Sequence, residues 1–371
     1  MFGGVKHLHD LTVIIPTLNE ELSIGKIIRD VQDVLTGIDY QILVVDDDSK
    51  DNTASIVNAY HLVNPRVSIL VRKEDHGLSQ SVVDGFHVAD SEICLVIDAD
   101  GQHPVHKIPE LYMEIKNGAD IAIASRYMDG GGIEHWSLGR KIISIGATVI
   151  ARIFFPNITD PGSGFFAIRK EVLVGAELKP KGYKILVEIL GKGYWKTVTE
   201  IPFVFGDRAV GESKLKQTTI IEYLKQLWSL TIYTATHHDR PAYKEFERVL
   251  KFLCVGVTGV VVNIGLLYIL TEYAGIFYLV SSLVGIEASI ISNFILNDLW
   301  TFNDIPGKHS KTKRFLRFHV VSITGLIINM VTLALLTEVF GVWYIVSSLV
   351  GILLAFTWNF TVNRRITWTK V

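Results

Sequence analysis

The stretch ICLVIDADGQHP, residues 93–104, decides the fold of the first part of this chain. Its first five residues are apolar, and the run ends at Asp98 and Asp100, which only Ala99 separates. Polar residues follow from Gly101 onward. This pattern is typical of a buried strand that reaches the edge of a sheet and continues into a loop.

Two earlier segments have the same form. LTVIIP (11–16) runs into the loop PTLNE, and QILVVDDDS (41–49) ends in three aspartates. Helical patterns lie between such runs, the first from Ser23 to about Leu35. The alternation continues with strands at 67–71, 92–98 and 119–125 and a helix at 78–89. It predicts an α/β domain with a mostly parallel sheet, whose ligands bind at the carboxyl ends of the strands.

Six carboxylates should therefore gather at one edge of the sheet. They are Glu20, Asp46, Asp47, Asp48, Asp98 and Asp100. Their mutual repulsion requires a cation or hydrogen-bond donors to offset it. Asp98 and Asp100 can approach one metal ion if the chain turns at Ala99, and hard oxygen ligands suit Mg²⁺ or Mn²⁺. The alternative for such a pair is a solvated turn at the end of a strand.

The motifs VIIPTLNE, VVDDDSKDNT, HGLSQSVVDGF and VIDADGQHP occur in the order and at the spacing of a known family. Together they resemble family-two, A-type-fold inverting glycosyltransferases. The segments ASRY (124–127), DPGSGFFAIRK (160–170), GYKILVEIL (182–190) and GESKL (211–215) resemble dolichyl-phosphate mannose synthases. The resemblance extends over about residues 10–230 and implies a Rossmann-like A-type domain.

The resemblance also implies roles for single residues. Those matching the nucleotide-sugar site are Pro16, Leu18, Glu20, Val45, Asp47, Asp98, Ala99, Lys184, Arg208 and Lys214. Asp98, Asp100 and Gln102 match the signature that binds Mg²⁺ or Mn²⁺. Arg126 and Arg140 match the positions that hold the acceptor phosphate, and with Asp100 they form the expected catalytic set. For either arginine, a surface salt bridge is the alternative.

The implied reaction transfers mannose from GDP-mannose to dolichyl or polyprenyl phosphate, with inversion, at the cytoplasmic face of a membrane. One alternative is a relative that uses UDP-glucose. Another is a flippase or transporter of lipid-linked sugars with a regulatory nucleotide-sugar-binding domain. The 36 basic and 38 acidic residues nearly cancel, so the composition gives no indication of a nucleic-acid partner. The sequence contains no signal for oligomeric state.

The last third of the chain is an internal duplication. Residues 248–302 align with 314–368 at a constant offset of 66, and 24 of the 55 aligned positions are identical. Each copy contains two apolar stretches of about 20 residues, the length that crosses a bilayer. We therefore expect four transmembrane helices in two parallel repeats, near 249–271, 277–296, 315–337 and 343–362. This region resembles the GtrA-like membrane domain.

Basic residues flank the first and last spans and fill the loop between the second and third. The other two loops, EYAGIF and EVFGVW, have none. The distribution predicts a multi-pass membrane protein with both termini and the catalytic domain in the cytoplasm. The expected divisions are a glycosyltransferase domain at 1–215, interfacial or juxtamembrane helices at 216–245 and a membrane domain at 246–371.

Two amphipathic segments, 136–155 and 218–233, are interpreted either as interfacial helices or as helices packed on the domain's own core. Glu287 lies in the middle of the second span, where its counterpart in the other repeat is Leu353. It is either a functional group or a carboxyl hydrogen-bonded inside the bundle. Four asparagines that recur in the two copies are expected to form interhelical hydrogen bonds: Asn263, Asn293, Asn329 and Asn359.

Overall fold

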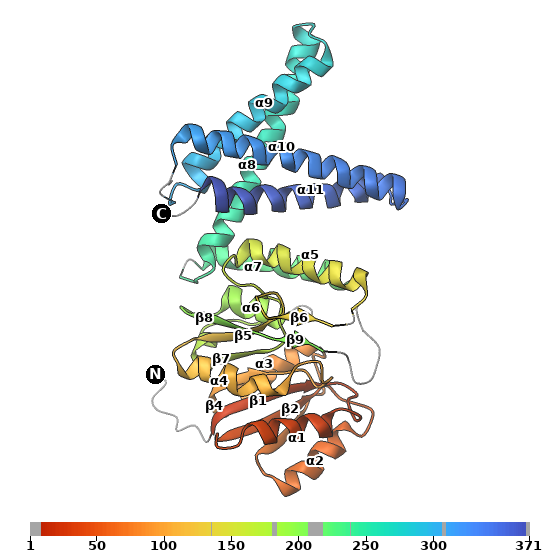
Figure 1. Ribbon diagram of the computed structural model, residues 1–371, viewed down its shortest axis with the longest axis vertical. Helices are drawn as coiled ribbons and strands as arrows, with labels where there is room; N and C mark the ends of the chain where they lie inside the picture. The colour runs from red at the N-terminus through yellow and green to blue at the C-terminus, as the bar shows by residue number, and fades with distance from the viewer. Residues whose placement is uncertain are drawn as a thin grey trace. The chain divides into compact units, whose positions relative to one another are not determined.

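The computed structural model describes residues 9–134, 136–179, 184–206, 218–237, 239–305 and 309–368. The chain divides into two compact units, Met1–Lys244 and Glu245–Val371. Figure 1 shows the elements of both units.

The first unit is built on a seven-stranded sheet in the order β3-β2-β1-β4-β7-β5-β8. Pairing is parallel throughout except at β7, so the expected mostly parallel α/β fold is confirmed. The strands are β1 His9–Thr17, β2 Tyr40–Asp46, β3 Val67–Val71, β4 Ser91–Val96, β5 Ile121–Ser125, β7 Phe166–Arg169 and β8 Val198–Pro202. A separate two-stranded ladder joins β6 Gly132–Ile133 to β9 Val204–Phe205.

Helices cover both faces of the sheet because the strands are apolar on both sides. On one face, Leu11, Val13 and Ile15 of β1 form one core cluster with side chains of α1 and α4. On the other face α3 lies so close to β1 that a Cβ on Gly85 would be 2.7 Å from Ile14 Cγ2. The helices are α1 Ile24–Val34, α2 Thr53–Val63, α3 Leu78–Val88, α4 Ile108–Lys116 and α6 Ile185–Lys192.

Strand β7 is the feature that the alternating pattern did not predict. It runs antiparallel between β4 and β5, with Phe166 opposite both Val96 and Ile123. Because its direction is reversed, its amino end lies at the edge where β4 and β5 have their carboxyl ends. The loop 160–165 therefore reaches the same edge as Asp98.

Both amphipathic segments are helices, α5 Leu138–Phe154 and α7 Thr218–Thr236, and they lie side by side (Figure 1). The hydroxyl of Tyr223 in α7 donates to the carbonyl of Ala147 in α5 at 3.0 Å. Each helix also packs on the domain, for example through Leu230 against Gly191 of α6. Apolar side chains remain exposed on both helices: Ile143, Ile145, Val149, Trp228 and Ile232. One face thus packs on the domain, as the second interpretation required, and the exposed face keeps the interfacial prediction open.

The second unit contains four helices long and apolar enough to cross a membrane: Tyr243–Tyr273, Tyr278–Thr301, Lys311–Val339 and Tyr344–Thr367. Their α-helical parts are α8 Tyr243–Tyr268, α9 Tyr278–Leu296, α10 Lys311–Ala334 and α11 Tyr344–Val362. Each continues into a five-residue π-helical turn: Ile269–Tyr273, Asn297–Thr301, Leu335–Val339 and Asn363–Thr367. The turns recur at the same offset of 66, so the two sequence repeats are also structural repeats.

Within each repeat the two helices approach closely through glycines that face asparagines. A Cβ on Gly259 would lie 2.5 Å from the amide of Asn293, and one on Gly325 would lie 2.4 Å from Oδ1 of Asn359. Among the described residues the Oδ1 atoms of these asparagines have no hydrogen-bond partner. Within the described part of the chain these oxygens therefore accept none of the expected interhelical hydrogen bonds, because the amides pack against glycine backbone on the facing helix.

The close approach can be tested by Gly325→Ala. We expect a loss of about 1–3 kcal/mol in stability, because the new methyl group must displace the amide of Asn359. Gly265→Ala is the matched control, since its Cβ would meet no atom within 4 Å. Thermal unfolding of the purified protein in detergent measures both variants. Equal effects would contradict the packing described here.

Glu287 lies close to a histidine of the other repeat. Its Oε1 lies 3.6 Å from Nδ1 of His319 in α10, and the glutamate side chain is 51% exposed. The duplicated positions are Leu353 and Leu253, so both polar residues replace leucines of the other copy. The carboxyl is thus neither isolated nor enclosed in the bundle.

Candidate functional site

The three aspartates that end β2 each have their own donors, which the sequence could not show. Asp46 is 1% exposed, and its carboxylate accepts from Thr17 Oγ1 at 3.0 Å and from the backbone N–H of Ser49 at 2.9 Å. Asp48 forms ion pairs with Lys50 and Lys73, which lower the pKa of its carboxyl to about 2. Local donors and lysine or arginine side chains therefore offset much of the charge of this triplet.

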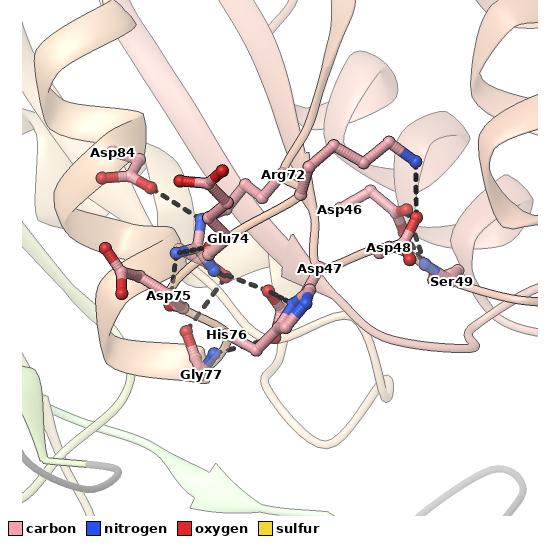
Figure 2. A network of polar contacts seen from close by, with 12 residues as sticks. Asp46, Asp47, Asp48, Ser49, Arg72, Glu74, Asp75, His76, Gly77 and Asp84 are labelled. Atoms are coloured by element: carbon pink, nitrogen blue, oxygen red, sulfur yellow. Dashed lines mark hydrogen bonds and ion pairs between the residues drawn. The ribbon is translucent and has the colours of Figure 1, made fainter.

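Asp47 lies between these two and is held most firmly (Figure 2). Its carboxylate, 7% exposed, accepts from Arg72 Nη1 at 2.6 Å and from the backbone N–H of Gly77 at 2.8 Å. The ring of His76 is within 2.9 Å of the same carboxylate. The backbone N–H of Asp47 donates to the carbonyl of Thr17 at 2.9 Å, which places it beside the loop that follows β1.

The loop after β1 carries the first predicted nucleotide-binding residues. Pro16 lies opposite Val45 in the β1–β2 register, and Leu18 is 39% exposed. Asn19 adopts a left-handed conformation with φ of 56°, and its Oδ1 accepts from the backbone N–H of Lys50. The N–H of Glu20 donates to Thr53 Oγ1 at 2.9 Å. The loops after β1 and β2 are thus joined, which brings all these positions to one edge.

The residues predicted to bind metal lie together after β4. Asp100 Oδ1 accepts from the backbone N–H of Gln102 at 3.1 Å. The Nε2 of Gln102 donates to the carbonyl of Gly206 at 3.0 Å, so its Oε1 is presented on the opposite side of the amide. Two carboxylates and an amide oxygen are a donor set that fits Mg²⁺ or Mn²⁺. Within the part of the chain that the structure describes, no group of three His, Cys, Asp or Glu side chains is placed to hold a metal.

His103 holds the backbone of this loop through a hydrogen bond, a role that sequence reasoning missed. Its Nδ1 accepts from the backbone N–H of Asp98 at 3.2 Å. The ring stacks on Phe165 with centroids 5.1 Å apart and meets Phe203 and Phe205 edge-on. Burial in this cage lowers the pKa of His103 to about 4, so the imidazole is neutral near pH 7.

Arg126 follows β5 and is 8% exposed. Its Nε and Nη2 donate to the two carboxylate oxygens of Asp160 at 2.7 and 2.9 Å. Asp160 is fully buried, and its backbone N–H donates to Glu200 of β8 at 3.0 Å. The alternative for Arg126 was a salt bridge at the surface, whereas the salt bridge with Asp160 is buried. Only the Nη1 side of the guanidinium is left by Asp160 to face an acceptor phosphate.

Arg140, in the first turn of α5, lies with its guanidinium 4.0 Å from the ring centroid of Trp136. Trp136 meets Phe205 edge-on at 5.3 Å, and Arg126 lies 5.7 Å from the same Phe205 ring. The aromatic pair therefore connects the two predicted acceptor arginines. The sequence alone could not predict the contact between Trp136 and Phe205, because the two residues lie almost 70 positions apart in the chain.

Lys184 precedes α6, and its ammonium donates to the carbonyl of Gly162 at 2.7 Å. The pKa of Lys184 is lowered to about 8, chiefly by burial and then by the charge of Arg126, which together outweigh the opposing effect of Asp160 and Asp98. The loop 160–165 thus carries contacts to two of the predicted site residues. Arg208 and Lys214 lie outside the described residues.

Comparisons with known proteins follow the division of the chain. Residues 12–175 match the family model "Glycosyl transferase family 2", and residues 251–368 match "GtrA/DPMS, transmembrane domain". The chain is 42% identical over 361 residues to a dolichol-phosphate mannosyltransferase of Pyrococcus furiosus, which covers 96% of this chain and 99% of that protein. It is 33% identical to a dolichol-phosphate mannosyltransferase of Saccharomyces cerevisiae, over 66% of this chain and 95% of the yeast protein.

Among solved structures, glucosyl-3-phosphoglycerate synthase from Mycobacterium tuberculosis, in complex with Mn²⁺, UDP and phosphoglyceric acid, is 18% identical with a TM-score of 0.48. The match covers 60% of this chain and 78% of that one.

Proposed function

Because the chain belongs to the dolichol-phosphate mannosyltransferases of glycosyl transferase family 2, we infer that GDP-mannose is its donor and a polyprenyl phosphate its acceptor. It is a glycosyltransferase and an integral, multi-pass membrane protein. The observation that carries the proposal is the 42% identity, which extends over both units of the chain and nearly the whole relative. UDP-glucose as donor and a flippase activity without transfer are the alternatives that the experiment below separates.

The proposed reaction is a single displacement at the anomeric carbon. An oxygen of the acceptor phosphate forms a bond to C1 of mannose, the bond from C1 to the β-phosphate oxygen breaks, and GDP leaves with that electron pair. The acceptor is already anionic near neutral pH, so the attack needs no strong general base. Inversion at C1 follows from a single displacement.

Asp98, Asp100 and Gln102 would hold a divalent ion, which when bound stabilises charge on the departing diphosphate. The protein's own part is to hold these oxygens in place. His103 fixes the backbone of Asp98, and Gly206 fixes the amide of Gln102. Such preorganised charge stabilisation acts without rearrangement during the reaction.

The acceptor phosphate would be held by Arg126 and Arg140. Asp160 fixes the plane of the Arg126 guanidinium through two hydrogen bonds, which leaves its Nη1 side for a phosphate oxygen. The exposed apolar faces of α5 and α7 would bring this site to the membrane surface. The basic residues around the spans support a cytoplasmic catalytic domain.

The assay uses purified full-length protein, polyprenyl phosphate and Mg²⁺ or Mn²⁺, with radiolabelled GDP-mannose and UDP-glucose offered separately. We expect labelled lipid-linked mannose and no lipid-linked glucose. Glucose transfer alone would change the donor and keep the mechanism. If neither sugar is transferred, the proposal fails, and movement of lipid-linked sugar across vesicles would favour the flippase.

A further inference from the structure

The network drawn in Figure 2 centres on Arg72, which directly follows β3 and is 5% exposed. A guanidinium has five N–H donors, and here each of the five has an acceptor. The acceptors are Asp84 Oδ2 at 2.6 Å, Asp47 Oδ1 at 2.6 Å, Ser81 Oγ at 3.1 Å, and the carbonyls of Glu74 at 3.2 Å and Asp75 at 2.6 Å. Arg72 therefore has no donor left to offer a substrate, and any effect it has on binding must pass through its partners.

Asp47 is the partner that borders the predicted nucleotide site. Its Oδ1 accepts from Arg72 and from Nδ1 of His76, and its Oδ2 accepts from the N–H of Gly77. Since the carboxylate can only accept, Nδ1 of His76 carries the hydrogen of this bond. An ionised carboxylate has about four acceptor positions. Contacts from the described residues occupy three of them, which leaves one position on Oδ2.

The same arginine also fixes the turn 74–77 that supplies two of these donors. Asp75 has a φ of 51° and Gly77 a φ of 146°, so the backbone here is in a region that L-residues seldom adopt. The two carbonyls that point to Arg72 hold the turn in this shape. Removing the guanidinium would therefore release both Asp47 and the turn that carries His76 and Gly77.

We propose that Arg72 is a positioning residue for the donor nucleotide, which holds Asp47 so that its one remaining acceptor position receives a hydroxyl or N–H of the nucleoside. The inference rests on the proposed function, because it takes Asp47 to be a nucleotide contact. A carboxylate fixed before binding loses no rotational freedom when the ligand arrives, so preorganisation favours affinity for the donor. The acceptor lipid and the departing diphosphate do not require this contact.

The test compares steady-state kinetics of full-length wild type and Arg72→Lys. A lysine offers three donors in place of five and keeps the charge. We expect the KM for GDP-mannose to rise about tenfold or more, as is usual when a supporting residue is lost. The kcat and the KM for polyprenyl phosphate should stay within about twofold, because only donor binding is affected.

Lys73→Gln is the matched control. Lys73 is the next residue along and pairs with Asp48, with its side chain 72% exposed. We expect no change in any of the three constants. A general loss of activity in Arg72→Lys, with kcat and both KM values affected alike, would overturn the proposal in favour of a merely structural role.

The double variant Asp47→Asn with Arg72→Lys gives a second readout. If Arg72 acts through Asp47, its substitution should add little to the donor KM of Asp47→Asn. If the two substitutions raise the donor KM independently, so that their fold-changes multiply in the double variant, the proposal is overturned. Should Arg72→Lys fail to fold, His76→Ala replaces it. This substitution removes one donor of Asp47, and the His76 side chain is 54% exposed, so its loss should not disturb folding.

For His76→Ala we expect a donor KM raised several-fold at an unchanged melting temperature, and an unchanged KM would count against the proposal. Wild type that transfers no mannose would refute the proposed function itself. If the wild type transfers mannose and the Arg72 variant has an unaltered KM for GDP-mannose, only this inference is refuted.

Discussion

Replacing Asp100 with asparagine is expected to lower kcat for mannose transfer about a thousandfold, the size of effect seen when one group stabilising transition-state charge is lost. The substitution removes one of the two carboxylates predicted to hold the divalent ion, while the amide still accepts from the N–H of Gln102. The loop should therefore stay folded. The measurement is the initial rate of lipid-linked mannose formation at saturating GDP-mannose over a series of Mn²⁺ concentrations.

The matched control is Asp48→Asn, an aspartate of the same sheet edge whose carboxylate pairs with Lys50 and Lys73. Its kcat should stay within about twofold of wild type, because an exposed ion pair contributes little. Chelation with EDTA should abolish transfer by the wild type, and added Mn²⁺ or Mg²⁺ should restore it. Full activity of Asp100→Asn, or activity that survives EDTA, would remove the metal from the proposed mechanism.

Replacing Asp160 with alanine is expected to cost about 3–5 kcal/mol of stability, since it leaves the buried guanidinium of Arg126 without its carboxylate. Asp160 is fully buried. Its carboxylate accepts hydrogen bonds from Nε and Nη2 of Arg126 at 2.7 and 2.9 Å and from the backbone N–H of Arg126 at 3.2 Å. Chemical unfolding of the full-length protein in detergent, followed by tryptophan fluorescence, measures the loss.

A double variant, Arg126→Met with Asp160→Leu, separates the pair from the rest of the loop. It should recover much of the stability, because no buried charge remains unpaired. It should not recover mannose transfer if Arg126 holds the acceptor phosphate. Equal stability of Asp160→Ala and wild type would show that the pair does not contribute to folding.

Much of the site could be predicted because it lies on local sequence patterns. Asp98, Asp100 and the DDDS motif follow apolar strands directly, and parallel strands place their carboxyl ends at one edge. What the pattern could not give is the partner of each side chain. Asp47 is held by Arg72, 25 residues on, and Arg126 by Asp160, 34 residues on. These contacts depend on which strands become neighbours.

The membrane unit shows the same division. The duplication and the four spans were evident from a 66-residue offset and from apolar length. The packing was not, because whether an amide bonds across a helix pair or lies against a glycine depends on the distance between the helices. The polar pair of Glu287 and His319 likewise required knowledge of which helices of the two repeats meet.

By itself, the sequence determined the alternation of strands and helices, the carboxylates at the strand ends and the paired membrane repeats. The first two follow from local patterns of apolar and polar residues, and the repeats follow from identities at a constant offset of 66 residues. Only the tertiary structure decided the direction of β7, which brings Asp160 to Arg126 and the loop 160–165 to Asp98. A strand of only four residues, such as Phe166–Arg169, carries no pattern that fixes its direction. Its orientation is set by its neighbours in the sheet, and those neighbours are far away in the chain.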